Sequence, residues 1–203
     1  MINKFSKVFV KLVFAVLVLS SLQGCLGTAL VVGGVSAGAS MVHDRRTAGT
    51  IVDDETIEFK VMNALSEAPE TSGEDVHINN VSYNYHVLLT GEVPNSTSKN
   101  AATRQARSVA KVKKVTNELA IAEISTLGAR STDVWITTKV KANLFSVDIE
   151  GFDPTRVKVV TERKIVYLMG LVTREEGNAA ADVARNIEGV AKVVKVFEYI
   201  VKD

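Results

Sequence analysis

The chain has 203 residues, of which 24 are basic, 23 acidic and 46% hydrophobic, with a formal net charge of +1. This length accommodates two domains of ordinary or small size, but not three. The near-zero charge argues against a general nucleic-acid binder, which usually carries a strong basic excess. The one cysteine, Cys25, can form neither an internal disulfide nor a cysteine-cluster metal site. Cys25 is therefore either incidental or the site of its own chemistry.

The first 24 residues have the pattern of a secretory signal peptide. A positive start with Lys4, Lys7 and Lys11 precedes an apolar run over residues 12–19, and small residues lead to Cys25. The apolar run is too short for a helix that spans a bilayer of about 30 Å. We therefore exclude residues 1–24 from the fold.

The motif Leu-x-Gly-Cys that ends at Cys25 resembles the bacterial lipobox. This resemblance implies cleavage before Cys25, a diacylglycerol group on its thiol and an N-acyl chain, which together anchor the protein in a membrane. In the enteric lipoprotein pattern, an aspartate directly after the cysteine retains the protein in the inner membrane. This chain has Leu26 at that position, which favours the outer membrane. Cleavage removes three lysines and no acid, so the mature chain has 21 basic and 23 acidic residues, a net charge of −2. The alternative is an ordinary signal peptide with an incidental cysteine.

Residues 25–53 are predicted to form a lipidated tether rich in glycine and alanine. Four glycines between residues 26 and 40 weaken the alternative of a transmembrane helix, and no cluster of charges marks its far end. We expect the first folded element to begin near Asp53.

An internal repeat dominates the rest of the chain. A shift of 79 residues gives ten identities across the forty positions 54–93. The shift pairs Asp54 with Asp133, Ile57 with Ile136, Val61 with Val140, Leu65 with Leu144, and Gly91 with Gly170. After a slip of one residue, residues 100–102 match residues 178–180. We name residues 54–123 copy one and residues 133–203 copy two, joined by a linker over 124–132 with Gly128 as its hinge-like residue.

Each copy is predicted to be α+β, with the order helix, strand, strand, helix, strand. In copy one, Asp54 is a plausible N-cap, and Ile57, Val61 and Leu65 form one helix face. Its strands are expected over residues 76–81, 87–89 and 115–121 and its second helix over 100–109. The helices of copy two are expected over 133–145 and 174–187, and its strands over 157–160, 165–171 and 193–200. Two helices on one face of a three-stranded sheet would bury both apolar stripes.

This pattern resembles the BON domain, twice over and behind a lipobox, as in dual BON-domain outer-membrane lipoproteins. The resemblance rests on Asp-x-x-Ile-x-x-x-Val-x-x-x-Leu in the first helix and Leu-x-Gly-x-Val at the end of strand two, present in both copies. Copy two adds Gly189-Val190 before its last strand. Copy one has Lys111 in place of Gly189, which predicts a different last turn.

The first helix of copy two has apolar residues on two sides. Ile136, Val140 and Leu144 form the core stripe. The other side carries Val134, Trp135, Thr138, Ala142 and Phe145, flanked by Lys139 and Lys141. Copy one has Thr56 in place of Trp135, so the fold does not need the tryptophan. A tryptophan beside lysines suits a bilayer interface. From the residues alone, packing against the other copy or the linker is equally consistent.

The resemblance implies that the second BON domain binds anionic phospholipid, such as phosphatidylglycerol or cardiolipin, through this helix, with Trp135 in contact with lipid. Copy two has no net charge whereas copy one carries −3, which also favours copy two. The resemblance further implies an outer-membrane lipoprotein that faces the periplasm, is enriched at division sites and supports envelope integrity. The alternative is a protein-interaction module or chaperone that assists the outer-membrane assembly machinery.

The sequence shows no catalytic or metal-binding motif. The three histidines, His43, His77 and His86, have no partner at metal-ligand spacing, and we expect His77 and His86 at the surface or in turns. The cluster of Lys111, Lys113 and Lys114 is interpreted as a solvated helix end. We therefore expect that the protein is not an enzyme and that it holds no metal and no cofactor apart from the acyl chains at Cys25.

Overall fold

The computed structural model describes residues 44–201, which belong to one compact unit. The predicted signal peptide, Cys25 and most of the tether lie outside the described residues. Within residues 44–201, no helix has both the length and the apolarity required to cross a membrane.

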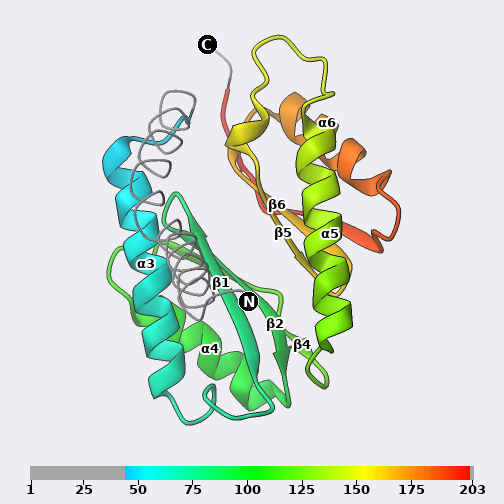
Figure 1. The fold of residues 1–203 in the computed structure, drawn as a ribbon. Helices are drawn as coiled ribbons and strands as arrows, with labels where there is room; N and C mark the ends of the chain where they lie inside the picture. Colours follow the sequence, from blue (N-terminus) through cyan, green and yellow to red (C-terminus); the bar gives the residue numbers. More distant parts are fainter. Residues whose placement is uncertain (1–43, 202–203) are drawn as a thin grey trace, which may run out of the picture. The chain divides into compact units, whose positions relative to one another are not determined.

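Both copies have the predicted order of elements, and the α+β fold is confirmed (Figure 1). The elements of copy one are α3 (Ala48–Glu67), β1 (His77–Tyr83), β2 (His86–Val93), α4 (Ser96–Ser108), β3 (Lys114–Asn117) and β4 (Ala120–Ile121). Strand β2 pairs with β1 antiparallel and with β3 and β4 in parallel. The predicted closing strand is thus two short strands along β2.

Copy two follows the same plan with small interruptions. Its elements are α5 (Leu127–Leu144), the 3₁₀ turn η1 (Pro154–Arg156), β5 (Lys158–Glu162), β6 (Ile165–Met169), β7 (Leu171–Val172), α6 (Arg174–Arg185), β8 (Lys192–Lys195) and β9 (Glu198–Tyr199). Strand β6 lies between antiparallel β5 and parallel β8, and β7 pairs with β9 in parallel. In Figure 1, α5 and α6 cover one side of this sheet, as α3 and α4 do in copy one.

Matched positions build the two helix-covered cores. Ile57, Val61 and Leu65 pack against β2 and the α4 alanines, and their repeat partners Ile136, Val140 and Leu144 pack against β6 and α6 in the same way. Alanine on the second helix allows the helix to approach the sheet closely. The core stripes predicted from the sequence are therefore confirmed.

Both first helices begin earlier than expected. Helix α3 begins at Ala48 and α5 at Leu127, so the sequence-based starts near Asp53 and at Asp133 were wrong. Thr47 and Thr126, again 79 residues apart, are the N-caps, and each side chain accepts a hydrogen bond from a backbone N–H three residues on. The residues from 127 to 132, including Gly128, are helical rather than a hinged linker.

Asp54 and Asp133 lie inside their helices and hold the β-hairpin turns instead. Asp133 accepts hydrogen bonds from the backbone N–H groups of Arg163 and Lys164, at 2.9 and 2.8 Å. Asp54 does the same for the turn that follows β1. The two residues of each turn have positive φ, as two-residue type I′ turns require. The aspartate of the repeat is therefore a turn clamp and not an N-cap.

The last turn is the same in both copies, contrary to our prediction. Lys111 adopts φ 71° and Gly189 φ 87°, so the lysine takes the left-handed conformation for which glycine is usual. The Lys111 ammonium lies 2.7 Å from a carboxylate oxygen of Asp53, an ion pair that accompanies this conformation.

The helix-free faces of the two sheets pack together. Tyr83 and Leu88 of copy one share a buried apolar cluster with Tyr167, Met169 and Val196 of copy two. Strand β2 is buried along its whole length because both of its faces are covered. His86 lies in this strand at only 8% exposure, and His77 lies half-buried in β1, so their expected place at the surface or in turns was wrong.

Candidate functional site: the outer face of α5

An exposed apolar stripe runs along α5. Leu127, Val134 and Phe145 are 82%, 67% and 73% exposed, and Trp135 is 45% exposed. At 100° per residue, the first three lie within about 20° of one line on the helix surface. From Leu127 to Phe145 the stripe extends about 27 Å at 1.5 Å per residue. Single exposed apolar residues are normal on a protein surface, so the feature of interest is that these side chains lie on one side of one helix.

Basic residues accompany this stripe. Lys139 lies with its ammonium 5.5 Å from the centroid of the Trp135 ring, within range of a cation–π contact. Arg130, Lys139 and Lys141 give α5 three positive charges. Its one acid, Asp133, is buried and points to the β5–β6 turn. The exposed side of α5 is therefore both apolar and cationic.

The matched helix of copy one has the opposite electrostatic character. Helix α3 also exposes apolar side chains, with Phe59 59% and Met62 50% exposed. However, it carries five acids and one lysine, a net charge of −4, whereas α5 carries +2. At the positions of Val134 and Trp135, copy one has Glu55 and Thr56. The two helices share a scaffold and differ on the exposed face.

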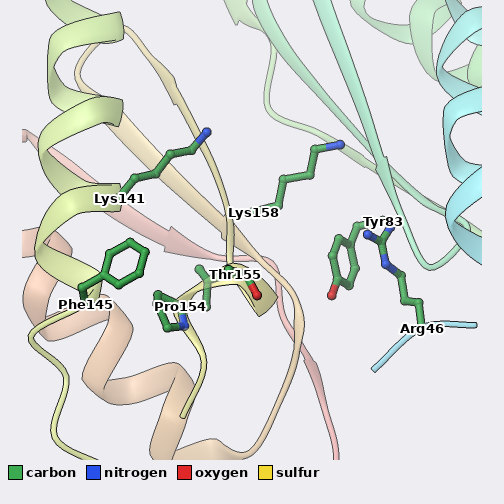
Figure 2. Close-up of a pocket in the computed structure, with 8 residues that line it drawn as sticks. Arg46, Tyr83, Lys141, Phe145, Pro154, Thr155 and Lys158 are labelled. Carbon is green, nitrogen blue, oxygen red and sulfur yellow. The ribbon is translucent and has the colours of Figure 1, made fainter. Parts of the chain in front are cut away.

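A pocket of about 350 Å³ lies at the C-terminal end of α5. Lys141 and Phe145 line it together with Pro154 and Lys158, and Figure 2 shows the Phe145 ring beside Pro154. Tyr83 of copy one closes one wall. The pocket therefore adds an apolar floor and two lysines to the end of the stripe.

Copy one holds the Tyr83 wall in place. The Arg46 guanidinium stacks on the Tyr83 ring at 3.8 Å and pairs with Asp44 and Asp54, both at 2.7 Å. Burial raises the pKa of Tyr83 to about 12, so its hydroxyl stays protonated and donates to the Arg156 carbonyl at 3.4 Å. The wall is thus uncharged near neutral pH, and its hydroxyl proton is already donated within the protein.

The segment before α3 also binds copy two. The Arg45 guanidinium makes two hydrogen bonds to the carboxylate of Glu176, at 2.7 and 2.8 Å, and a third to the Leu171 carbonyl. This ion pair lowers the pKa of Glu176 against the opposing effect of burial. This segment follows the predicted tether in the sequence, and it contacts copy two through Arg45 as well as copy one through Arg46.

All seven residues predicted for the lipid patch are exposed and lie on α5 or at its C-cap. These are Val134, Trp135, Thr138, Lys139, Lys141, Ala142 and Phe145. Neither Trp135 nor Phe145 is buried against copy one or the linker. The sequence-based patch lacked Leu127, because the helix was expected to begin six residues later. The seven-residue step back from Val134 was the signal that could have identified it.

The BON domain family model matches residues 53–123 and 132–200. The chain therefore belongs to the BON domain family, with two copies of the domain. The two matches coincide with copy one and copy two, so each repeat copy is one BON domain.

Two curated relatives cover most of the chain. It is 46% identical over 180 residues to the outer membrane lipoprotein DolP of Haemophilus influenzae, which spans 88% of this chain and 90% of that protein. It is 40% identical over 157 residues to a 21 kDa hemolysin of Actinobacillus pleuropneumoniae, which spans 77% and 79%. The first relative places the chain in an outer-membrane lipoprotein family.

Among solved structures, one similar chain is CdsD, a structural protein of the type III secretion system of Chlamydia trachomatis. The identity is 14% and the TM-score 0.28, over 72% of this chain and 63% of that chain. A similarity at this level has no bearing on the fold or the function.

Proposed function

We propose that copy two binds anionic phospholipid headgroups through the exposed face of α5, and that the protein is a non-enzymatic, lipid-anchored attachment module that faces the periplasm. The observation that supports this most directly is the difference between the matched helices. Both expose apolar residues, but only α5 combines them with a tryptophan and a positive charge. An anionic surface attracts α5 and repels α3.

The chemistry of each group fits an interface between water and lipid. The Trp135 ring suits the headgroup level, and Leu127, Val134 and Phe145 suit the shallow apolar region below it. A lysine or arginine near an anionic leaflet contributes about 1 kcal/mol, so Arg130, Lys139 and Lys141 together provide selectivity for acidic headgroups. Because an acyl anchor already holds the chain at the membrane, even a weak second contact fixes its orientation.

The repeat supplies variants that the fold tolerates. In residues 44–203 without the anchor, we would replace Val134, Trp135 and Phe145 by the residues of copy one at the same positions, Glu, Thr and Ser. Vesicles of phosphatidylcholine with and without phosphatidylglycerol or cardiolipin are then titrated. We expect the unchanged protein to bind only the anionic vesicles, and the triple variant to bind at least about tenfold more weakly, because three apolar side chains are lost from the interface.

Two controls make this result specific. Phe59→Thr in α3 introduces the residue of copy two on the other helix and should leave vesicle binding unchanged. Trp135 is the one tryptophan of the chain, so its emission should shift to shorter wavelength on binding. Equal binding of the triple variant to anionic vesicles would refute the lipid proposal. If the unchanged protein bound neither type of vesicle, the result would instead favour the alternative, in which α5 contacts a component of the outer-membrane assembly machinery.

In the cell, this activity would support envelope integrity. The family resemblance supports enrichment at division sites, and a headgroup-selective contact would concentrate the protein wherever anionic lipid is enriched. A fluorescent fusion of the triple variant should keep its membrane anchor and lose any such enrichment. Enrichment that persists in the variant would separate the division-site property from lipid binding.

A further inference from the structure

A second cluster of chemically active side chains lies between the copies, away from the α5 stripe. It joins His77 of β1, Glu92 of β2 and Glu162 of β5. One ligand atom of each residue lies within 4.8 Å of the other two. His77 and Glu92 are direct partners across β1 and β2, and their side chains share the face that packs on copy two. The fold therefore brings together three residues that are distant in the sequence.

We propose that His77, Glu92 and Glu162 bind one divalent transition-metal ion of the zinc class, which links copy one to copy two. The donor set combines an imidazole nitrogen with two carboxylate oxygens. Zinc accepts such mixed nitrogen and oxygen ligands, whereas calcium and magnesium prefer oxygen alone. With water as the fourth ligand, the site completes a tetrahedron.

The negative charge of this cluster also favours a bound cation. Glu92 is fully buried and Glu162 is 5% exposed. Glu92 is compensated by one guanidinium, that of Arg163 at 3.3 Å, and by hydrogen bonds from His77 and Ser125. In the described part of the chain, Glu162 pairs with no cation, and Asn79 is its one side-chain donor, at 2.9 Å. A buried carboxylate without a positive partner is costly, and a divalent cation between the two carboxylates removes that cost.

The distances require only small movements. Ligands at about 2.0–2.2 Å from a tetrahedral ion lie about 3.4 Å from one another. The Nδ1 atom of His77 is already 2.9 Å from the Oε2 atom of Glu92. A Glu162 oxygen lies within 4.8 Å of the other two ligand atoms, so a movement of about 1.4 Å or less brings it to the required separation. Asn79 lies 3.4 Å from Nε2 of His77, and its amide oxygen, once rotated, can accept the Nε2–H and so leave Nδ1 as a ligand.

Within residues 44–201, the repeat does not supply a second such site. In the repeat, Arg156, Leu171 and Tyr83 take the positions of His77, Glu92 and Glu162, and none of them offers an equivalent ligand set. The cluster is therefore specific to one end of the contact between the copies. A metal held there would fix the copies relative to each other, since its ligands come from both.

Zinc titration of the full-length chain tests this proposal. The protein is prepared without an affinity tag, in non-ionic detergent, and with Cys25→Ser in every variant so that no thiol competes for zinc. We expect one zinc ion per chain by calorimetry and a higher Tm with zinc. His77→Asn and Glu162→Gln should each weaken zinc binding at least about tenfold.

A matched control carries the same type of contact without the ligand set. The carboxylate of Glu198 accepts a hydrogen bond from Asn84 of the other copy at 2.7 Å, so Glu198→Gln should leave zinc affinity unchanged. The Tm of each variant without metal shows whether the variant still folds. Absence of saturable zinc binding, equal affinity for magnesium, or affinity that survives both ligand substitutions would overturn the proposal. None of these outcomes depends on vesicle binding by α5.

Discussion

Removal of the Asp133 side chain tests whether this aspartate is a turn clamp or a helix cap. Asp133 is 5% exposed, and its two carboxylate oxygens accept from the N–H groups of Arg163 and Lys164. Both turn residues have positive φ, a conformation that the aspartate helps to hold. Asp133→Ala therefore deprives two N–H groups of their acceptors at a strained turn.

The expected loss follows from the type of hydrogen bond. A hydrogen bond to a charged group contributes about 1.5–3 kcal/mol, and water can replace part of it at the half-exposed turn. We therefore expect Asp133→Ala to lower the free energy of unfolding by about 3 kcal/mol. Asp133→Ser keeps one short acceptor and should lose about 2 kcal/mol. A helix N-cap would accept serine at almost no cost.

Urea unfolding of residues 44–203, followed by circular dichroism, measures these differences. Asp182→Ala is the control, because Asp182 is exposed on α6 and should change stability by less than about 0.5 kcal/mol. Thr126→Ala at the true N-cap should cost about 1 kcal/mol. If Asp133→Ser were as stable as the unchanged protein, or if Asp133→Ala behaved like Asp182→Ala, the turn-clamp explanation would be refuted.

Two further predictions concern His86 and Gly91. Burial lowers the pKa of His86 to about 4 from an ordinary 6.5, so the unfolded chain binds the proton first, and stability present above pH 6.5 falls by up to about 3 kcal/mol toward pH 4. His86→Gln should flatten that part of the pH dependence of urea unfolding; an unchanged slope would refute this assignment. Gly91 has φ +117°, and an added Cβ would lie 2.0 Å from the His77 carbonyl oxygen, so Gly91→Ala should cost more than about 3 kcal/mol in the same assay. Gly49→Ala in α3, where the added Cβ meets ordinary contacts, should instead be neutral or stabilising, and equal effects of the two changes would contradict the steric argument.

The core stripes and the order of elements could be predicted from the sequence, because they depend only on which residues are buried. Ile57, Val61 and Leu65 recur at four-residue steps because one helix face packs on a sheet, and the repeat doubled the signal. The order of elements and the family followed from that pattern. The exposure of Val134 and Trp135 was also predictable, because copy one has Glu55 and Thr56 at these positions and the fold therefore does not require apolar residues there.

The helix starts could not be found from the core pattern. The first turns of α3 and α5 precede the first core positions, Ile57 and Ile136, so no apolar periodicity marks them. Thr47 and Thr126 carry the signal instead, but only once the repeat is extended backward. An aspartate near a helix start is a common N-cap, and nothing local distinguishes it from one that reaches a turn thirty residues away.

The contact between the copies also has a signal in the sequence. Strand β6 is apolar on both faces, and β2 carries Leu88 on its helix-free face. An apolar residue on the second face of a strand indicates that this face is covered as well. The alternate residues, such as Leu88 and Tyr167, therefore required a second covering layer. The cluster of His77, Glu92 and Glu162 depends on this contact, so its residues do not have the local spacing of a metal-binding motif in the sequence.

The covered sheets also explain where binding can take place. In each copy the helices cover one face of the sheet and the other copy covers the opposite face, so the sheet faces offer no surface to a ligand. Recognition is left to the outer faces of the helices and to the edge of the contact between the copies. In the lipid proposal, the charges of −4 on α3 and +2 on α5 favour the approach of an anionic membrane to α5 over the matched helix α3. In this proposal the two copies have different roles: copy two supplies the binding helix, while copy one buries the second sheet face and its matched helix α3 repels an anionic surface.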